Sequence, residues 1–450
     1  MISVYRIGIE ELSGIFSGIV VDNRDSILLR ETSKDLSYLL KLLVKDGNIH
    51  EKKIDYVGLS TDVVGRALND QKTSLPVAIV RAGVSENNFS YKPGEYFFRS
   101  IKMPPIHSFF IKGSMNLTDG RNRVLDLRKI QEIGRSIRDN REIKGIGIIG
   151  LFSNFFPEME EEIATELRRT VGRGIPITLS SALSQKSLVY RESFLLSNLL
   201  LTQTVSMVLS KYTETVSKTL KNRWVYFLKN DGSLLSSATA IRYPIFLKDV
   251  TMVSKIVGAV SSSKIRNLDL IMKSGNRTVQ MSAYDSRPIM IKVRSSLRQE
   301  FGAFFYSVFK NINSNENNIH SVLINLQKKG DRTIVVDSEL LSKFKKLQSL
   351  GVFPMQIDGF LGAMGAASAP IRITADFIGS TQFQGRKEAL EEAKNKAMQK
   401  MVSEGADTST TRVIQADEIP VSYLPWFVLR NKISIEGKPV RPESSKMRGG

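Results

Sequence analysis

Six consecutive residues, Lys229-Asn-Asp-Gly-Ser-Leu234, have the side chains and the backbone freedom that suit an anion site. They follow an apolar run, Trp224 to Leu228, which predicts a buried strand. Gly232 can adopt a positive φ, and Ser233 is placed to cap a helix that would begin at Leu234. Such a strand end can present backbone N–H groups to an anion through Asn230, Asp231, Gly232 and Ser233. The alternative is a plain turn, since Asn-Asp-Gly is common in ordinary loops.

Few residues are available for nucleophilic or metal chemistry. The chain has no cysteine, which excludes disulfides, thiol nucleophiles and thiolate metal sites. Its three histidines, His50, His107 and His320, are not at helix-face spacing, and so few histidines give little scope for a triad. A histidine metal cluster and a catalytic triad are therefore not expected, whereas a site made of carboxylates stays open.

The chain is strongly basic, with 64 Lys and Arg residues against 45 Asp and Glu and a formal charge of +19. Such a charge attracts polyanions. The cations are scattered along the chain, however, and no nucleic-acid motif accompanies them. A solvated basic surface is the favoured interpretation, so nucleic-acid binding is expected to be weak and nonspecific.

One apolar stretch, Ser193 to Ser210, contains no charged residue and raises the question of a membrane span. It also holds Asn198 and Gln203, which are costly in hydrocarbon. A buried helix is the favoured alternative. The first residues show no secretory signal pattern, so a cytoplasmic protein without a membrane segment is expected.

Hydrophobic periodicity predicts a mixed α/β fold. Val4–Ile9, Gly18–Val21 and Ile27–Leu29 indicate an antiparallel meander, and alternating helices and strands follow. Later helices are expected at Asp126–Asn140, Met252–Ala259, Ser338–Gln348, Gly359–Ala369 and Gly385–Met401, and a loop is expected at Asn311–Asn318. The expected division is 1–84 as an N-terminal subdomain, 85–125 as an irregular insertion, 126–380 as a core, 381–437 as a C-terminal helix-strand domain, and 438–450 as a mobile tail.

Several short segments, in order along the chain, resemble one known family. They are Arg6-Ile-Gly-Ile9, Gly150-Leu-Phe-Ser-Asn154 with Pro157, Arg191-Glu192 with Asn198, Phe227 to Ser236 with Ala240-Ile-Arg-Tyr-Pro244, Gly365-Ala-Ala367, Glu388 to Lys394, Gly405-Ala-Asp407, and Ile419 to Pro425. In these segments the chain resembles the hydantoinase A/oxoprolinase family. The resemblance implies an actin-like (ribonuclease H-like) ATPase fold, in which ATP activates a cyclic amide or carbonyl substrate.

The resemblance also shows where the phosphate loops of that family would fall. The first, Asp-x-Gly-Gly-Thr-x-Thr-Asp, matches Glu10 to Ser17 without gaps, with Ser13 and Gly14 inside it, but Leu12 and Phe16 replace a glycine and a threonine. The second falls on Met272 to Val279, with Gly275 and Thr278 retained and both carboxylates lost. Phosphate-bound Mg²⁺ would thus lack its protein anchors, and a degenerate ATP site is expected.

The remaining candidates each have a structural alternative. Glu10 could orient water or bind a metal, or could be inert. Arg191 and Glu192 could face a substrate cleft, or could cap and solvate a helix. Gly362 and Gly365 could line an adenine pocket by resemblance, or could serve close helix packing.

The expected function is that of a hydantoinase/oxoprolinase-like subunit, related to ATP-dependent cyclic-amide hydrolases and acetone-carboxylase-type enzymes, with an assembly or noncatalytic role. A second subunit of hydantoinase B type, or further copies of the same chain, would be its partner. No cofactor is expected, or ATP and Mg²⁺ if the site works. An active hydrolase with an unusual site and a basic polyanion-binding protein are the alternatives.

Overall fold

The structure, a computed structural model, describes residues 4–70, 75–83, 104–114, 124–183, 188–221, 224–292, 306–307, 309–380, 385–420 and 428–439. Most of the expected insertion at 85–125, the segment 421–427 and nearly all of the expected tail lie outside these residues.

The largest sheet joins the two ends of the chain. Its strands are β1 (Tyr5–Leu12), β2 (Ile15–Val21), β3 (Ile27–Ser33), β4 (Ile54–Thr61), β11 (Val225–Leu228), β12 (Leu234–Ser236), β21 (Ile371–Ser380), β22 (Arg412–Pro420) and β23 (Val428–Gly437). Their order is β22-β23-β21-β12-β11-β4-β1-β2-β3. The predicted opening meander is confirmed, with β1 antiparallel to β2 and β2 antiparallel to β3.

Helices cover both faces of the N-terminal strands. The helices α1 (Leu36–Asp46), α2 (Val63–Asn69) and α5 (Leu188–Leu220) share one apolar core with β1, β2 and β4, which includes Ile9, Leu40 and Leu196. On the other face, α11 (Gly359–Ser368) contacts β1, β2 and β4 and also packs along α7 (Val250–Ser263). Small residues make this contact close, because a Cβ at Gly258 would overlap the Leu361 carbonyl oxygen of α11.

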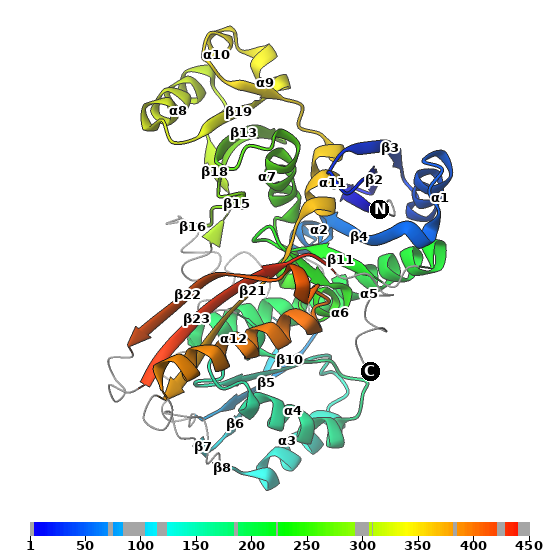
Figure 1. Cartoon of the computed structure of the whole chain (residues 1–450). Coiled ribbons are helices and arrows are strands. Elements are labelled where there is room, and N and C mark those ends of the chain that lie inside the picture. Colours follow the sequence, from blue (N-terminus) through cyan, green and yellow to red (C-terminus); the bar gives the residue numbers. More distant parts are fainter. Residues whose placement is uncertain are drawn as a thin grey trace.

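A second sheet has four parallel strands in the order β10-β9-β5-β6. The strands are β5 (Val77–Ala82), β6 (Ile106–Ile111), β9 (Ile146–Gly150) and β10 (Ile177–Leu179). The helices α3 (Leu127–Asp139) and α4 (Glu158–Val171) bury Ile133 and Ile163 in its core. A short pair, β7 (Gly113–Ser114) and β8 (Val124–Leu125), lies nearby in Figure 1.

A third sheet contains β13 (Leu268–Ser274), β14 (Arg277–Tyr284), β15 (Arg287–Pro288), β18 (Phe309–Ile312), β19 (Thr333–Asp337) and β20 (Phe353–Met355). The helices α8 (Glu316–Lys329), α9 (Ser338–Lys343) and α10 (Lys345–Gln348) pack on it, while β16 (Ile291–Lys292) pairs with β17 (Tyr306–Ser307). In Figure 1 this sheet and the four-stranded sheet lie at opposite ends of the molecule, with the nine-stranded sheet between them.

The C-terminal helix α12 (Arg386–Ser403) lies along β21 and β23 (Figure 1). Ala389, Ala393, Ala397 and Met401 are buried, and the last three share a core with Ile433 and Ile435 of β23. The sequence predicts that Leu390, Ala393, Ala397 and Met401 pack on the strands around Val413 and Val428. The packing on β23, which begins at Val428, is confirmed. The other strand beneath the helix is β21, which precedes it, rather than β22, where Val413 is exposed, and Leu390 is only partly buried.

Three local predictions are wrong. Leu234 begins the strand β12 rather than a helix, and the helix α6 (Ser237–Arg242) is capped by Ser236 instead of Ser233. The described part of the supposedly irregular insertion contains β6, which completes the parallel sheet beside β5. The expected Asn-rich loop at 311–318 is the end of β18 and the start of α8, whose N-cap Asn315 accepts a hydrogen bond from the Asn318 N–H.

One described helix segment, Arg191–Leu220 within α5, is long and apolar enough to cross a membrane by length and composition. Half of its most apolar window is buried inside the protein, against α1, α2 and α6.

Candidate functional site

The expected first phosphate loop is the tight turn of the β1–β2 hairpin. Leu12 faces Ile15 in the register, so Ser13 and Gly14 alone form the turn, both with positive φ. Two-residue hairpin turns favour this conformation. The Gly14 N–H donates to Glu11 Oε1 at 2.8 Å, and Glu11 is itself held by two hydrogen bonds from Arg66. The donors and acceptors around this turn thus hold the turn itself.

Glu10 directly precedes Glu11 in β1, and its side chain is buried, with 1% of the residue exposed. Its carboxylate forms an ion pair with the Lys255 ammonium of α7 and accepts a 2.7 Å hydrogen bond from Ser254 Oγ. Lys255 Nζ also donates to the Asp358 carbonyl oxygen at 2.5 Å. Burial raises the pKa of Glu10 above its ordinary value, while the Lys255 charge opposes that rise.

The helix α11 closes over this ion pair. A Cβ at Gly362 would overlap the Glu10 carboxylate, and one at Gly359 would overlap the Ser17 hydroxyl. Gly365 meets the Ser254 carbonyl of α7 in the same way. The structure therefore brings together Glu10, Gly362 and Gly365, and it does so through close packing of α11 on β1 and α7.

A Mg²⁺ ion does not fit this arrangement of side chains. Magnesium needs oxygen ligands, usually from carboxylates, phosphates and water. At Glu10 an ammonium group already neutralises the carboxylate, and no group of three or more His, Asp or Glu side chains converges elsewhere in the described part of the chain.

The expected second phosphate loop is the turn of the β13–β14 hairpin, where Ser274 faces Arg277. Gly275 has a positive φ and open space around it. Thr278 is buried, and its hydroxyl lies 3.1 Å from the Ser314 hydroxyl, beneath the turn. No carboxylate belongs to this turn, whose residues are Ser274, Gly275, Asn276 and Arg277.

Arg191 and Glu192 lie near the start of the long helix α5, on the side of the four-stranded sheet. Glu192 forms a bidentate ion pair with Arg81 of β5, with both distances 2.8 Å. Arg191 donates to Asn154 Oδ1 at 2.9 Å and to the Gly150 carbonyl oxygen at the end of β9. Arg191 and Glu192 are both buried, and they join α5 to the four-stranded sheet. They lie away from Glu10 and its partners.

The turn at Asn230–Ser233 connects β11 and β12. Asp231 Oδ1 accepts from the Ser233 N–H at 3.0 Å and from the Ser233 hydroxyl at 2.5 Å, while Lys229 Nζ lies 2.9 Å from Oδ2. The Asn230 N–H donates to the Phe246 carbonyl, which anchors the turn. Burial alone would raise the pKa of Asp231, but the charges of Lys229 and Arg372 and the Ser233 hydrogen bond lower it to about 2.

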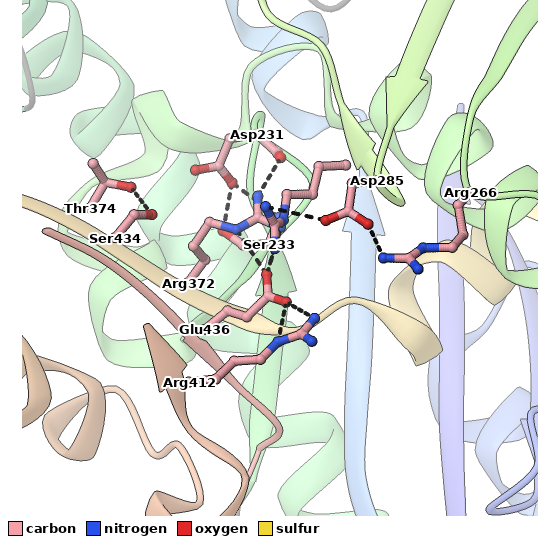
Figure 2. Close-up of polar contacts among 10 residues, drawn as sticks. Asp231, Ser233, Arg266, Asp285, Arg372, Thr374, Arg412, Ser434 and Glu436 are labelled. Carbon is pink, nitrogen blue, oxygen red and sulfur yellow. Dashed lines mark hydrogen bonds and ion pairs between the residues drawn. The ribbon is translucent and has the colours of Figure 1, made fainter. Parts of the chain in front are cut away.

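Next to this turn lies a charged cavity of about 890 Å³, here named the Glu436 cleft. Figure 2 shows its centre, where Arg372 and Arg412 both point at Glu436. Glu436 stands on β23 directly opposite Arg372 of β21 and opposite Arg412 of β22. Arg287 adds a third guanidinium, with its Nε 3.4 Å from Glu436 Oε2. Burial would raise the pKa of Glu436, yet these arginines hold it below its ordinary value.

Sequence reasoning missed Lys255, Glu436 and their partners. One signal was present, because Lys255 is the only charged residue between Val250 and Ser263, and a lysine on an apolar helix needs a partner when buried. The Glu436 cleft had no comparable signal, since its residues come from strands far apart in sequence.

Two solved structures resemble the whole chain. Nucleotide-free acetone carboxylase aligns over 98% of this chain and 88% of its own, with 10% identity and a TM-score of 0.64. ATP-dependent caprolactamase from Pseudomonas jessenii aligns over 97% of this chain and 88% of its own, with 11% identity and a TM-score of 0.67.

No protein-family model matches the sequence, and no curated protein is similar to it. At such low identity the structural likeness concerns the fold. The expected fold class is confirmed: the chain has the actin-like ATPase fold, with mixed sheets covered by helices, that acetone carboxylase and the caprolactamase share.

Proposed function

We propose that this protein is a hydantoinase A/oxoprolinase-type subunit that does not use ATP and that acts in an assembly. The fold supports the first part of this proposal, since the two structures it resembles are an ATP-dependent caprolactamase and an acetone carboxylase. The Glu10–Lys255 ion pair supports the proposal that the protein does not use ATP.

The chemical reason concerns charge. A carboxylate at the end of the first strand could hold a cation that bridges to phosphate oxygens. Here Lys255 supplies a permanent cation from within the protein, and its ammonium also donates to the Asp358 carbonyl. A Mg²⁺ ion at Glu10 would have to displace Lys255 from a buried position, where an ammonium without a partner is costly.

Space gives a second, independent reason. The Glu10 carboxylate fills the volume that any side chain at Gly362 would occupy, so α11 and β1 leave no room between them for hydrated metal. Both hairpin turns also lack carboxylates in the described residues, since they consist of Ser13 with Gly14 and of Ser274 to Arg277.

The test is ligand-dependent melting of the purified chain with ATP and Mg²⁺, run beside an ATP-hydrolysis assay. A ligand at a hundred times its dissociation constant stabilises a protein by about 2.7 kcal/mol. We expect no upward shift in melting temperature and no phosphate release. The P. jessenii caprolactamase is the positive control in both assays.

A clear ATP-dependent shift would instead favour a working hydrolase. In that case the variant Lys255→Met shows where the nucleotide binds, because the affinity for a nucleotide held at Glu10 would change in this variant. A nucleotide held elsewhere would bind both proteins equally.

The assembly role is tested by sedimentation of the purified chain over a range of concentrations. A concentration-independent oligomer indicates that copies of this chain associate with one another. A monomer that forms a complex only with an added hydantoinase B-type chain supports the two-subunit arrangement. A monomer that associates with neither would contradict the assembly role.

A further inference from the structure

The Glu436 cleft lies at the opposite end of β1 from the Glu10 ion pair. It is lined by Arg6 near the start of β1, by Lys264 at the end of α7, and by the β14–β15 turn, in addition to β21, β22 and β23. Its volume of about 890 Å³ falls in the range of small-molecule sites. None of the residues in the two expected phosphate loops lines it, whereas Gly232 of the Asn230–Ser233 turn does.

Three guanidinium groups converge on a single carboxylate in this cleft. Arg372 donates to Glu436 Oε2 from Nε and Nη2, at 3.3 and 3.1 Å. Arg412 donates to Oε1 from the same two atoms, at 3.2 and 2.7 Å. Arg287 approaches Oε2 as well. One negative charge therefore faces three positive charges.

The neighbouring acids supply only part of the missing charge. Asp285 forms an ion pair with Arg266 (Figure 2). Its other oxygen lies 3.8 Å from Arg287, so this one carboxylate is shared between two guanidiniums. Asp231 is held by Lys229, and its backbone oxygen rather than its carboxylate meets Arg372. Seven Lys and Arg residues line the whole cleft against four Asp and Glu residues.

Arg412 also keeps N–H groups that Glu436 does not use. Arg412 uses only Nε and Nη2 on Glu436, and 68% of its side chain is exposed. Arginine binds carboxylate and phosphate oxygens through paired N–H groups in a planar fork. Cross-strand pairing accounts for Arg372 and Arg412, which lie on the two neighbours of β23, so the third guanidinium, Arg287, exceeds what the sheet needs.

We propose that the Glu436 cleft binds a small multivalent oxyanion, with carboxylate or phosphate groups, between Arg412, Arg287 and the cations at the mouth of the cleft. Glu436 sets the orientation of the guanidiniums, and the ligand supplies the second negative charge. The site is independent of ATP use at Glu10.

Isothermal titration with citrate, inorganic phosphate and pyrophosphate tests this proposal at constant ionic strength set by chloride. The variants are Arg412→Gln and, as a matched control, Arg386→Gln. Arg386 is at the start of the helix α12, is 69% exposed and forms an ion pair with Glu418 of β22, outside the cleft. We expect saturable binding of at least one anion, weakened tenfold or more by Arg412→Gln and unchanged by Arg386→Gln.

Melting temperatures of both variants establish that they are folded, and Arg287→Gln provides a second test within the cleft. Preference for citrate or for pyrophosphate identifies carboxylate or phosphate as the ligand chemistry. No saturable binding, or equal weakening by the Arg412 and Arg386 variants, overturns the proposal, because the second result is what general basic charge produces. ATP binding that persists in Arg412→Gln would contradict the proposed function alone.

Discussion

The ammonium of Lys255 lies against the carboxylate of Glu10, and the two residues come from elements 245 positions apart in the sequence. Both side chains are buried, and α11 packs over them. This ion pair occupies the position at which the sequence resemblance places the first carboxylate of a phosphate loop.

Lys255→Met is expected to lower the free energy of unfolding by about 3–5 kcal/mol, because it leaves the Glu10 charge buried without its partner. The double variant Glu10→Gln with Lys255→Met should recover most of that loss. The loss in the single variant should also shrink as pH falls, since burial favours the protonated Glu10 carboxyl. Urea denaturation of the three proteins measures these effects. Equal stability of single and double variants would show that the unpaired charge is not the cause.

Asp231→Asn is expected to destabilise the protein in a pH-dependent manner. The pKa of Asp231 is lowered from 3.8 to about 2 in the folded protein, so its ionised form stabilises the fold above about pH 4. That stabilisation is lost as pH falls through about 2. The difference from wild type should therefore be about 2 kcal/mol at neutral pH and should vanish at the acid end.

The control for this measurement is Asp139→Asn, on the exposed end of α3, where Asp139 forms an exposed ion pair with Arg138. Its effect should stay within about 0.5 kcal/mol. A constant effect of Asp231→Asn across the pH range would contradict the assigned role of its charge.

Met401→Ala should destabilise the protein by roughly 2–5 kcal/mol, because Met401 is fully buried between α12 and β23 and its truncation leaves a cavity. Glu391→Ala, on the exposed face of the same helix, should change stability by no more than about 0.5 kcal/mol. Chemical denaturation compares the two. Similar small effects would mean that α12 contributes little to the core.

Nucleic-acid binding is expected to be weak and quenched by salt. For binding that rests on phosphate neutralisation, the logarithm of the binding constant falls linearly with the logarithm of the salt concentration. Titration of a labelled DNA duplex at low and at physiological salt should show this loss without sequence preference. Tight binding that survives physiological salt would support the polyanion-binding alternative.

Local patterns predicted most of the secondary structure. The alternation of apolar runs and turn residues identified β1, β2 and β3, and the spacing of Ile130, Ile133 and Ile137 identified α3. Prediction failed where tertiary pairing decides the conformation. Leu234 is a strand residue because β12 pairs with both β11 and β21, and the second of these is more than a hundred residues away.

The candidate sites were less predictable, since each depends on contacts between distant segments. Glu10 was recognised from its place after the first strand, whereas its partner Lys255 could be inferred only as a lysine needing some acidic neighbour. The Glu436 cleft arises from strand register, because Arg372 and Arg412 face one residue of the strand between them. Register of this kind is set by the whole sheet.

The strand order of the nine-stranded sheet has a consequence for synthesis on the ribosome. The strands β1 to β4 are complete within the first 61 residues, but β21 to β23 end at Gly437. At bacterial to eukaryotic elongation rates of about 5–20 residues per second, the early strands wait on the order of tens of seconds for the late ones. From the time β12 is made until β21 emerges, the edge of β12 that pairs with β21 is unpaired, and strands of other chains can add there. Efficient production of this protein should therefore depend on chaperones that shield this edge until the C-terminal strands emerge.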